Sequence, residues 1–173
     1  SWYNGLSLLN YLDNFEEKSE YNKSLRIPIQ YVIRSVNDFR GYSGTIVSGT
    51  MYKNQKVKVL PSGFNTTIKQ IIEKNVEKEI LNATSQKSVI FTLNDHIDLS
   101  RGDFLVDQDN PCEMADQFRI DLIWMDTKPL FPGRTYFIKM DCRLLKAKIL
   151  IRYKYDINNF QKLMSKKLEL NDI

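Results

Sequence analysis

The stretch Asp38-Phe39-Arg40-Gly41-Tyr42-Ser43-Gly44-Thr45-Ile46-Val47-Ser48-Gly49 decides the fold class of this chain. Gly41 and Gly44 interrupt a strand-like run, which is typical of a bulge or tight corner where a barrel strand bends. Short β-branched and apolar segments surround it, and glycine, proline or asparagine separates most of them. This pattern favours a small closed antiparallel barrel over a sheet covered by helices. The expected strands are 31–36, 45–51, 56–60, 66–72, 88–93 and 104–106.

A short helix is expected before this barrel. Ser7 can cap it, and apolar residues recur behind the cap at helical spacing, at Leu8, Leu9, Leu12 and Phe15. The polar run 107–111 ends in proline, which cannot continue a strand ladder, and it is the best internal boundary. We therefore predict a helix and linker at 1–24, a barrel at 25–108 and a second strand set at 109–173.

The second strand set is expected to be a truncated antiparallel barrel. Apolar side chains alternate over 118–124, a Pro132-Gly133 turn follows, and strands are expected at 135–140 and 145–155. About four strands in so short a segment are too few to pair every edge of a closed barrel. The predicted class is all-β, with two consecutive small barrels, the second incomplete.

Composition indicates an ordinary globular protein with a basic C-terminal end. The chain has 173 residues, 42% hydrophobic and 27% charged, with a net charge of +4. Residues 143–173 carry eight Lys or Arg against three Asp or Glu. The chain contains neither an apolar run as long as a membrane span nor a signal-peptide pattern at its start. Cys112 and Cys142 are expected to be free thiols, and we expect a cytoplasmic location and no membrane contact.

The sequence contains no recognisable motif of catalytic or metal-binding residues. None of the seven glycines precedes a lysine, so the sequence contains no phosphate-binding P-loop. His96 is the single histidine; it lies in a turn-like segment, and metal-ligand spacing is absent. We assign no catalytic, cofactor-binding or metal-binding residue.

Two further motifs have ordinary structural interpretations. Arg101-Gly102-Asp103 spells an adhesion tripeptide, but between two apolar segments it predicts a tight turn with Gly102 at the strained position. The 145–155 strand carries basic residues on one face, which could contact phosphates. Because its aromatic residues lie on the opposite face, we expect a solvated or protein-facing surface and no nucleic-acid contact.

The order of several segments resembles a known family. Segments 41–49, 57–63 and 97–104 together resemble the second domain of GTPases of the elongation factor Tu class. A closer resemblance is to the large, GTPase subunit of bacterial sulfate adenylyltransferase. It rests on these segments: Trp2-Tyr3-Asn4-Gly5, Pro28-Ile29-Gln30-Tyr31-Val32, Val59-Leu60-Pro61-Ser62-Gly63, Ile123-Trp124-Met125 and Leu130-Phe131-Pro132-Gly133-Arg134.

This resemblance implies a function for a larger parent protein. In that family the large subunit hydrolyses GTP and works with a small catalytic subunit, which joins ATP and sulfate into adenosine 5′-phosphosulfate and pyrophosphate. The chain would then be a non-catalytic barrel region that couples the GTPase domain to the small catalytic subunit. GTP and Mg would belong to a GTPase domain upstream, with no cofactor in this chain. The expected partners are that GTPase domain and the small subunit, and the expected contact residues are Arg40, Gly41, Tyr42, Gly44 and Arg101.

Two other classes of function stay open at this point. A translation-factor barrel that binds tRNA or the ribosome would show salt-dependent RNA binding through the basic 146–154 face. A stand-alone enzyme, such as a hydrolase, would show turnover by the purified chain.

Overall fold

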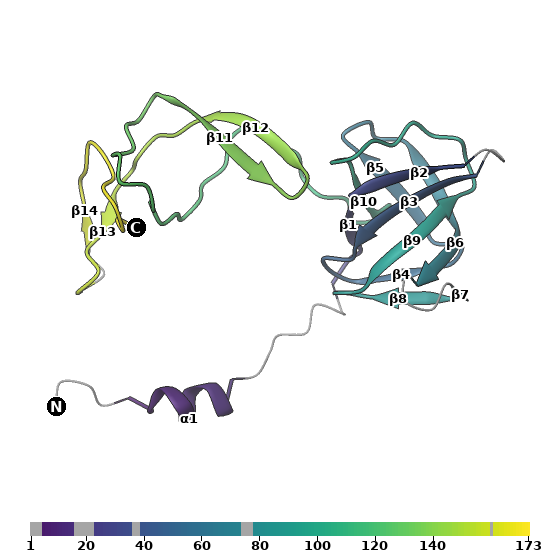
Figure 1. Ribbon diagram of the computed structural model, residues 1–173, viewed down its shortest axis with the longest axis horizontal. Helices are drawn as coiled ribbons and strands as arrows, with labels where there is room; N and C mark the ends of the chain where they lie inside the picture. The colour runs from purple at the N-terminus through teal and green to yellow at the C-terminus, as the bar shows by residue number, and fades with distance from the viewer. Residues whose placement is uncertain (1–4, 16–22, 36–38, 74–77, 160) are drawn as a thin grey trace. The chain divides into compact units, whose positions relative to one another are not determined.

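The computed structural model describes residues 5–15, 23–35, 39–73, 78–159 and 161–173. The chain divides into two compact units, one formed by residues 1–99 and 103–111 and the other by residues 100–102 and 112–173. Both are built from antiparallel strands, which confirms the predicted all-β class (Figure 1).

The first unit is a closed barrel. Its main sheet has the strand order β1-β10-β5-β6-β9-β3-β2, with β7 paired to β6. β1 and β2 stand at the two ends of this order, yet only two residues separate them in the chain, so the sheet closes on itself. A second ladder pairs β4 with β8. The strands span Arg26–Pro28 (β1), Tyr31–Arg34 (β2), Arg40–Thr45 (β3), Thr50–Tyr52 (β4), Lys56–Leu60 (β5), Asn65–Glu73 (β6), Lys78–Ile80 (β7), Asn82–Thr84 (β8), Ser88–Leu93 (β9) and Phe104–Asp107 (β10).

The interior of this barrel follows the predicted alternation of side chains. In β5, Val57 and Val59 are fully buried, whereas Lys56 is exposed. Tyr42 and Phe91 belong to the core and pack together with their ring centroids 5.8 Å apart. The Tyr42 hydroxyl donates a hydrogen bond to the Ile97 carbonyl at 3.1 Å, so the polar end of the ring is satisfied. Burial raises the pKa of this phenol, and it stays protonated as the donor.

The predicted helix is present. It spans Leu8–Asp13 (α1), and the Ser7 hydroxyl accepts a hydrogen bond from the Asn10 N–H at 3.3 Å, which confirms the predicted cap. Every described residue of 5–15 is exposed, including the apolar residues Leu8 and Phe15. Residues 1–4 and 16–22, which the prediction included in the helix and linker, lie outside the described residues.

The second unit contains two short ladders. Thr135–Met140 (β11) pairs with Arg143–Lys148 (β12), and Lys154–Tyr155 (β13) pairs with Lys162–Leu163 (β14). Leu130 and Leu168 are buried and are joined by two backbone hydrogen bonds of 2.8 and 3.0 Å. The two cysteines are free, as predicted.

Two strand predictions in this unit are wrong. Residues 118–124 form no strand, because the described chain pairs their backbone only at Trp124. The long strand expected at 145–155 is divided, because β12 ends at Lys148 and β13 begins at Lys154. Alternation identifies the two faces of a segment, but a ladder also needs a neighbouring backbone at the right spacing.

Asp172 connects separate parts of the second unit. Its carboxylate accepts hydrogen bonds from the Glu169 N–H at 2.8 Å and from the Lys154 ammonium at 3.0 and 3.2 Å. Its carbonyl accepts a hydrogen bond from the Trp124 N–H at 2.9 Å. Partial burial opposes the charge, but these donors outweigh it and hold the pKa of the carboxyl below its usual value.

We expect Asp172→Asn to destabilise the second unit at pH 7 by about 1 kcal/mol, because the variant loses a charge-assisted contact to Lys154. A carboxyl with a lowered folded pKa stabilises the fold above its unfolded pKa, and this contribution is lost as the pH falls through the folded pKa. The difference between variant and parent should therefore shrink below roughly pH 4. Urea unfolding, followed by Trp124 fluorescence in a Trp2→Phe background, measures it.

Glu169→Gln is the matched control. It breaks an exposed ion pair of 2.7 Å with Lys167 but leaves the backbone donor to Asp172 in place. Its cost should stay below about 0.5 kcal/mol. An equal, pH-independent loss in both variants would contradict the role given to Asp172.

Candidate functional site

The five predicted contact residues differ in accessibility. Gly41, Tyr42 and Gly44 are buried in β3 and offer no surface to a partner. Arg40 is half-buried at the start of the same strand, and Arg101 is exposed in a turn. Of the predicted contact residues, Arg40 on the first unit and Arg101 on the second are therefore accessible, while the three buried residues shape the barrel. Gly102 follows Arg101 with φ +91°, which confirms the predicted tight turn.

The two glycines in β3 are required for different reasons. A Cβ on Gly44 would lie 2.3 Å from the Pro28 carbonyl oxygen and 2.9 Å from Ile27, where β3 passes the end of β1. A Cβ on Gly41 would lie 2.9 Å from the Phe39 ring, a side chain that can rotate away. Gly44 therefore allows two backbones to approach, whereas Gly41 gives room to an aromatic ring on the barrel surface.

We expect Gly44→Ala to destabilise the barrel by about 3 kcal/mol, because backbone atoms must move to admit the methyl group. Gly41→Ala should cost less than about 1 kcal/mol, because only the Phe39 side chain has to rearrange. Urea unfolding of both variants under identical conditions tests the difference. Equal losses of stability in the two variants would show that the close backbone contact at Gly44 is not required for the barrel to close.

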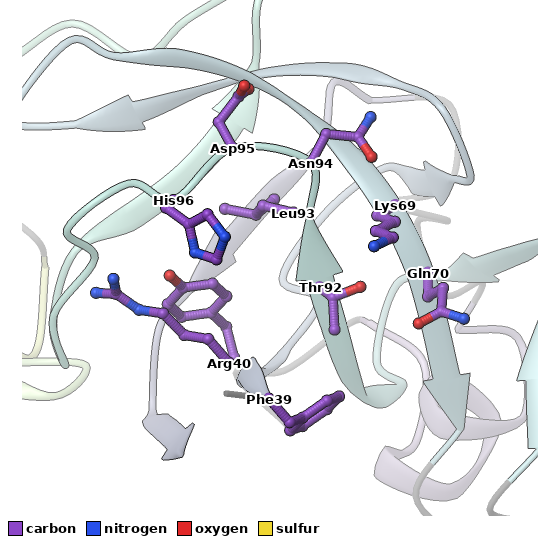
Figure 2. Close-up of a pocket in the computed structure, with 10 residues that line it drawn as sticks. Phe39, Arg40, Lys69, Gln70, Thr92, Leu93, Asn94, Asp95 and His96 are labelled. Carbon is purple, nitrogen blue, oxygen red and sulfur yellow. The ribbon is translucent and has the colours of Figure 1, made fainter. Parts of the chain in front are cut away.

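A shallow hollow of about 180 Å³ opens on the first barrel beside Arg40. Side chains from β3, β6 and β9 and from the loop after β9 line it (Figure 2). The view shows Thr92 between Arg40 and Gln70, and Asp95 directed away from the other labelled side chains. The lining residues are Phe39, Arg40, Tyr42, Lys69, Gln70, Thr92, Leu93, Asn94, Asp95 and His96.

The charged groups of this hollow are engaged to different degrees. The Arg40 guanidinium makes an ion pair with Asp98 at 3.0 Å and lies over the Tyr42 ring at 5.7 Å. Asp95 accepts a hydrogen bond from the Thr66 hydroxyl at 2.8 Å. Lys69 is exposed, and none of the carboxylates that the structure describes pairs with it.

Most of this hollow was not predicted from the sequence. The strands expected at 66–72 and 88–93 and the exposed loop expected at His96 are present. The proximity of Lys69 to Thr92 was not predicted, because it depends on the register between two strands. The β6–β9 register shifts between Ile68 and Gln70, so Lys69 is an extra residue in a β-bulge. The signal that could have found this shift is the adjacent polar pair Lys69-Gln70, which separates the buried Ile68 and Ile71 by three residues and so breaks the period of two.

The basic region of the second unit is partly neutralised. Lys154, expected on the solvated face of a strand, instead pairs with Asp172 at 3.0 Å. The Arg119 guanidinium donates a hydrogen bond to the Tyr153 hydroxyl at 2.7 Å, and the Lys162 ammonium lies 4.6 Å from the centre of that ring. Hydrogen bonding with Tyr155 and then with Arg119 lowers the pKa of Tyr153. Aromatic and basic groups therefore meet here more closely than the sequence predicted.

The described part of the chain contains neither a candidate metal centre nor a helix that could span a membrane. Within the described ranges, His, Cys, Asp and Glu side chains do not gather in groups of three or more. The single helix that the structure describes is far too short to cross a bilayer.

Comparison with known proteins identifies homologues of the chain. No family model matches the chain. It is 36% identical over 99% of its length to sulfate adenylyltransferase subunit 1 of Buchnera aphidicola subsp. Acyrthosiphon pisum, and 37% identical over the same share to that of Salmonella paratyphi B. The chain is homologous to part of sulfate adenylyltransferase subunit 1. It spans 36% of the length of these relatives, and the predicted resemblance is confirmed.

Solved structures of translation GTPases share the fold. The sup35 structure complexed with GMPPNP matches 95% of this chain and 40% of its own, with a TM-score of 0.70 and 21% identity. Apo elongation factor SelB from Methanococcus maripaludis matches 96% of this chain and 35% of its own, with a TM-score of 0.65 and 16% identity. At such low sequence identity the similarity shows the fold alone. It confirms the prediction that this chain has a barrel of the translation-factor type.

Proposed function

We propose that this homologue of sulfate adenylyltransferase subunit 1 is a non-catalytic barrel region of a GTP-hydrolysing subunit. It would connect a GTPase domain, which binds GTP and Mg, to a small catalytic subunit that makes adenosine 5′-phosphosulfate from ATP and sulfate. The observation that carries this proposal is the identity of 36–37% over nearly the whole chain to subunit 1 proteins, against 14–21% for the translation factors.

The barrel has properties that suit a mechanical role. Formation of a sulfate–phosphate anhydride is uphill, so coupling to GTP hydrolysis requires an element whose position depends on both reactions. Domains that rotate as rigid bodies about an interface provide such elements. A closed barrel with sixteen buried residues in one apolar cluster can transmit displacement without deforming.

The proposal makes a direct prediction for the purified chain. It should bind the small catalytic subunit with 1:1 stoichiometry, and it should show no stoichiometric binding of a fluorescent GTP analogue. Isothermal titration calorimetry measures binding of the small subunit, and fluorescence anisotropy measures binding of the GTP analogue. When added in excess to the reconstituted enzyme, the chain should lower adenosine 5′-phosphosulfate formation, because it occupies the small subunit without supplying GTP hydrolysis.

The second candidate function is RNA binding by a translation-factor barrel. It is favoured by the cluster of Arg119, Tyr153 and Lys162 on the second unit. It predicts tRNA binding whose affinity falls steeply with salt, and a loss of that binding in Lys162→Gln. Strong tRNA binding without affinity for the small subunit would replace the first proposal by the second.

A further inference from the structure

The hollow on the first barrel combines apolar walls with unpaired hydrogen-bonding groups. Its apolar surface comes from Phe39, Tyr42 and Leu93. Donor groups are available on Lys69 and Asn94. A ligand that fits such a site has a short apolar part and an acceptor at its end.

Volume limits the ligand further. Sites for small molecules and cofactors usually occupy roughly 300–1,000 Å³, whereas this hollow measures about 180 Å³. A nucleotide is too large to be enclosed here, and the space suits a single side chain or a small ion. The apolar walls favour a side chain, because a free inorganic anion has no hydrocarbon to place against them.

The bulge at Lys69 aims a cation at this hollow. Ile68 pairs with Leu93 and Gln70 pairs with Thr92, so Lys69 is the residue left without a partner across the ladder. Bulges of this kind redirect one side chain and are frequent beside functional sites. Lys69 is exposed and has no carboxylate partner among the described residues, so its charge is available to a ligand.

Two buried polar atoms in the walls of the hollow also lack partners. These are the Thr92 hydroxyl oxygen and the Arg40 Nε, for which the described residues supply no hydrogen bond. Thr92 is 7% exposed. An unpaired hydroxyl at such a position destabilises the barrel, and a rotation about χ1 would turn it toward an incoming acceptor.

We propose that this hollow binds the side chain of a glutamate from another polypeptide. The methylene groups of the glutamate lie against Phe39 and Leu93, and its carboxylate accepts hydrogen bonds from the Lys69 ammonium and the Thr92 hydroxyl. Asp95 keeps its negative charge, because its hydrogen bond comes from the neutral Thr66 hydroxyl. Its carboxylate is directed away from the other labelled side chains, which limits its repulsion of the ligand (Figure 2). Asp98 neutralises part of the Arg40 charge, so Lys69 is the principal cation of the site. This site is independent of the GTP-coupling role proposed above.

The test uses the whole chain and a short blocked alanine peptide with one central glutamate. Amide NMR shifts of residues 69–70 and 92–96 should move on titration, with weak, millimolar binding. The same peptide with glutamine at the centre should bind at least fivefold more weakly. Titrations with sodium acetate and sodium sulfate at equal ionic strength show whether the hollow prefers the glutamate side chain of a peptide to a free anion.

Three variants identify the groups that bind. Lys69→Gln should weaken binding of the glutamate peptide about three- to fivefold, as expected for loss of one exposed ion pair. Lys56→Gln removes another exposed lysine, from the neighbouring strand β5 outside the hollow, and should leave binding unchanged. Thr92→Val removes a hydroxyl without changing the shape; it should weaken binding while leaving stability equal or higher, because no internal hydrogen bond is lost.

The proposal is overturned if the shifts occur elsewhere, if the glutamine peptide binds equally well, or if Lys69→Gln and Lys56→Gln have the same effect. Sulfate binding more tightly than the peptide would also overturn it, in favour of a site for a free anion. A loss of stability in Thr92→Val would show that the hydroxyl already has an internal partner.

Discussion

The first barrel depends on the close approach of two backbones at Gly44. At this point β3 passes the carbonyl of Pro28, and a methyl group would lie 2.3 Å from that oxygen. β1 and β2 are consecutive in the chain but belong to opposite ends of the sheet order, so the chain must change ladders between them. The Ser43 carbonyl accepts a hydrogen bond from the Gln30 N–H at 2.8 Å and secures this crossing. The neighbouring Ile29 N–H donates to the Asp103 carbonyl at 2.8 Å, so both residues between β1 and β2 have backbone partners where the two ends of the sheet meet.

The elements that sequence predicted well are those whose pattern is set by local contacts. Alternation located β5 and β9 closely, because a buried strand places every second side chain in the core. Ser7 identified the start of α1, because an N-cap needs only residues within one turn. Residues 118–124 show the opposite case. They alternate as clearly as β5 does, yet no strand forms in the described chain, because alternation does not supply the neighbouring ladder.

The candidate site was harder to predict than the fold for the same reason. Arg40 was identified from a motif, but its ion-pair partner Asp98 lies 58 residues away. The hollow joins β3, β6 and β9, so its composition depends on register between strands that are distant in sequence. The bulge at Lys69 shifts this register by one residue. A one-residue shift reverses which side chains face outward. The two adjacent polar residues Lys69 and Gln70 break the alternation of residues 66–72 at this point, but they do not identify the strand that lies opposite.

The chemistry at Thr92 is not explained by barrel stability alone. Valine has the same shape, suits a strand equally well and would not bury a hydroxyl without a partner. Threonine therefore costs stability at this position unless another molecule accepts its hydrogen bond. The bulge at the exposed Lys69 is likewise not explained by stability, because it interrupts the β6–β9 ladder beside Thr92. If the barrel had only a structural role, a regular ladder and a valine at this position would make it more stable. The bulge at Lys69 and the unpaired Thr92 hydroxyl are both explained if the outer face of β6 and β9 binds a hydrogen-bond acceptor from a partner chain.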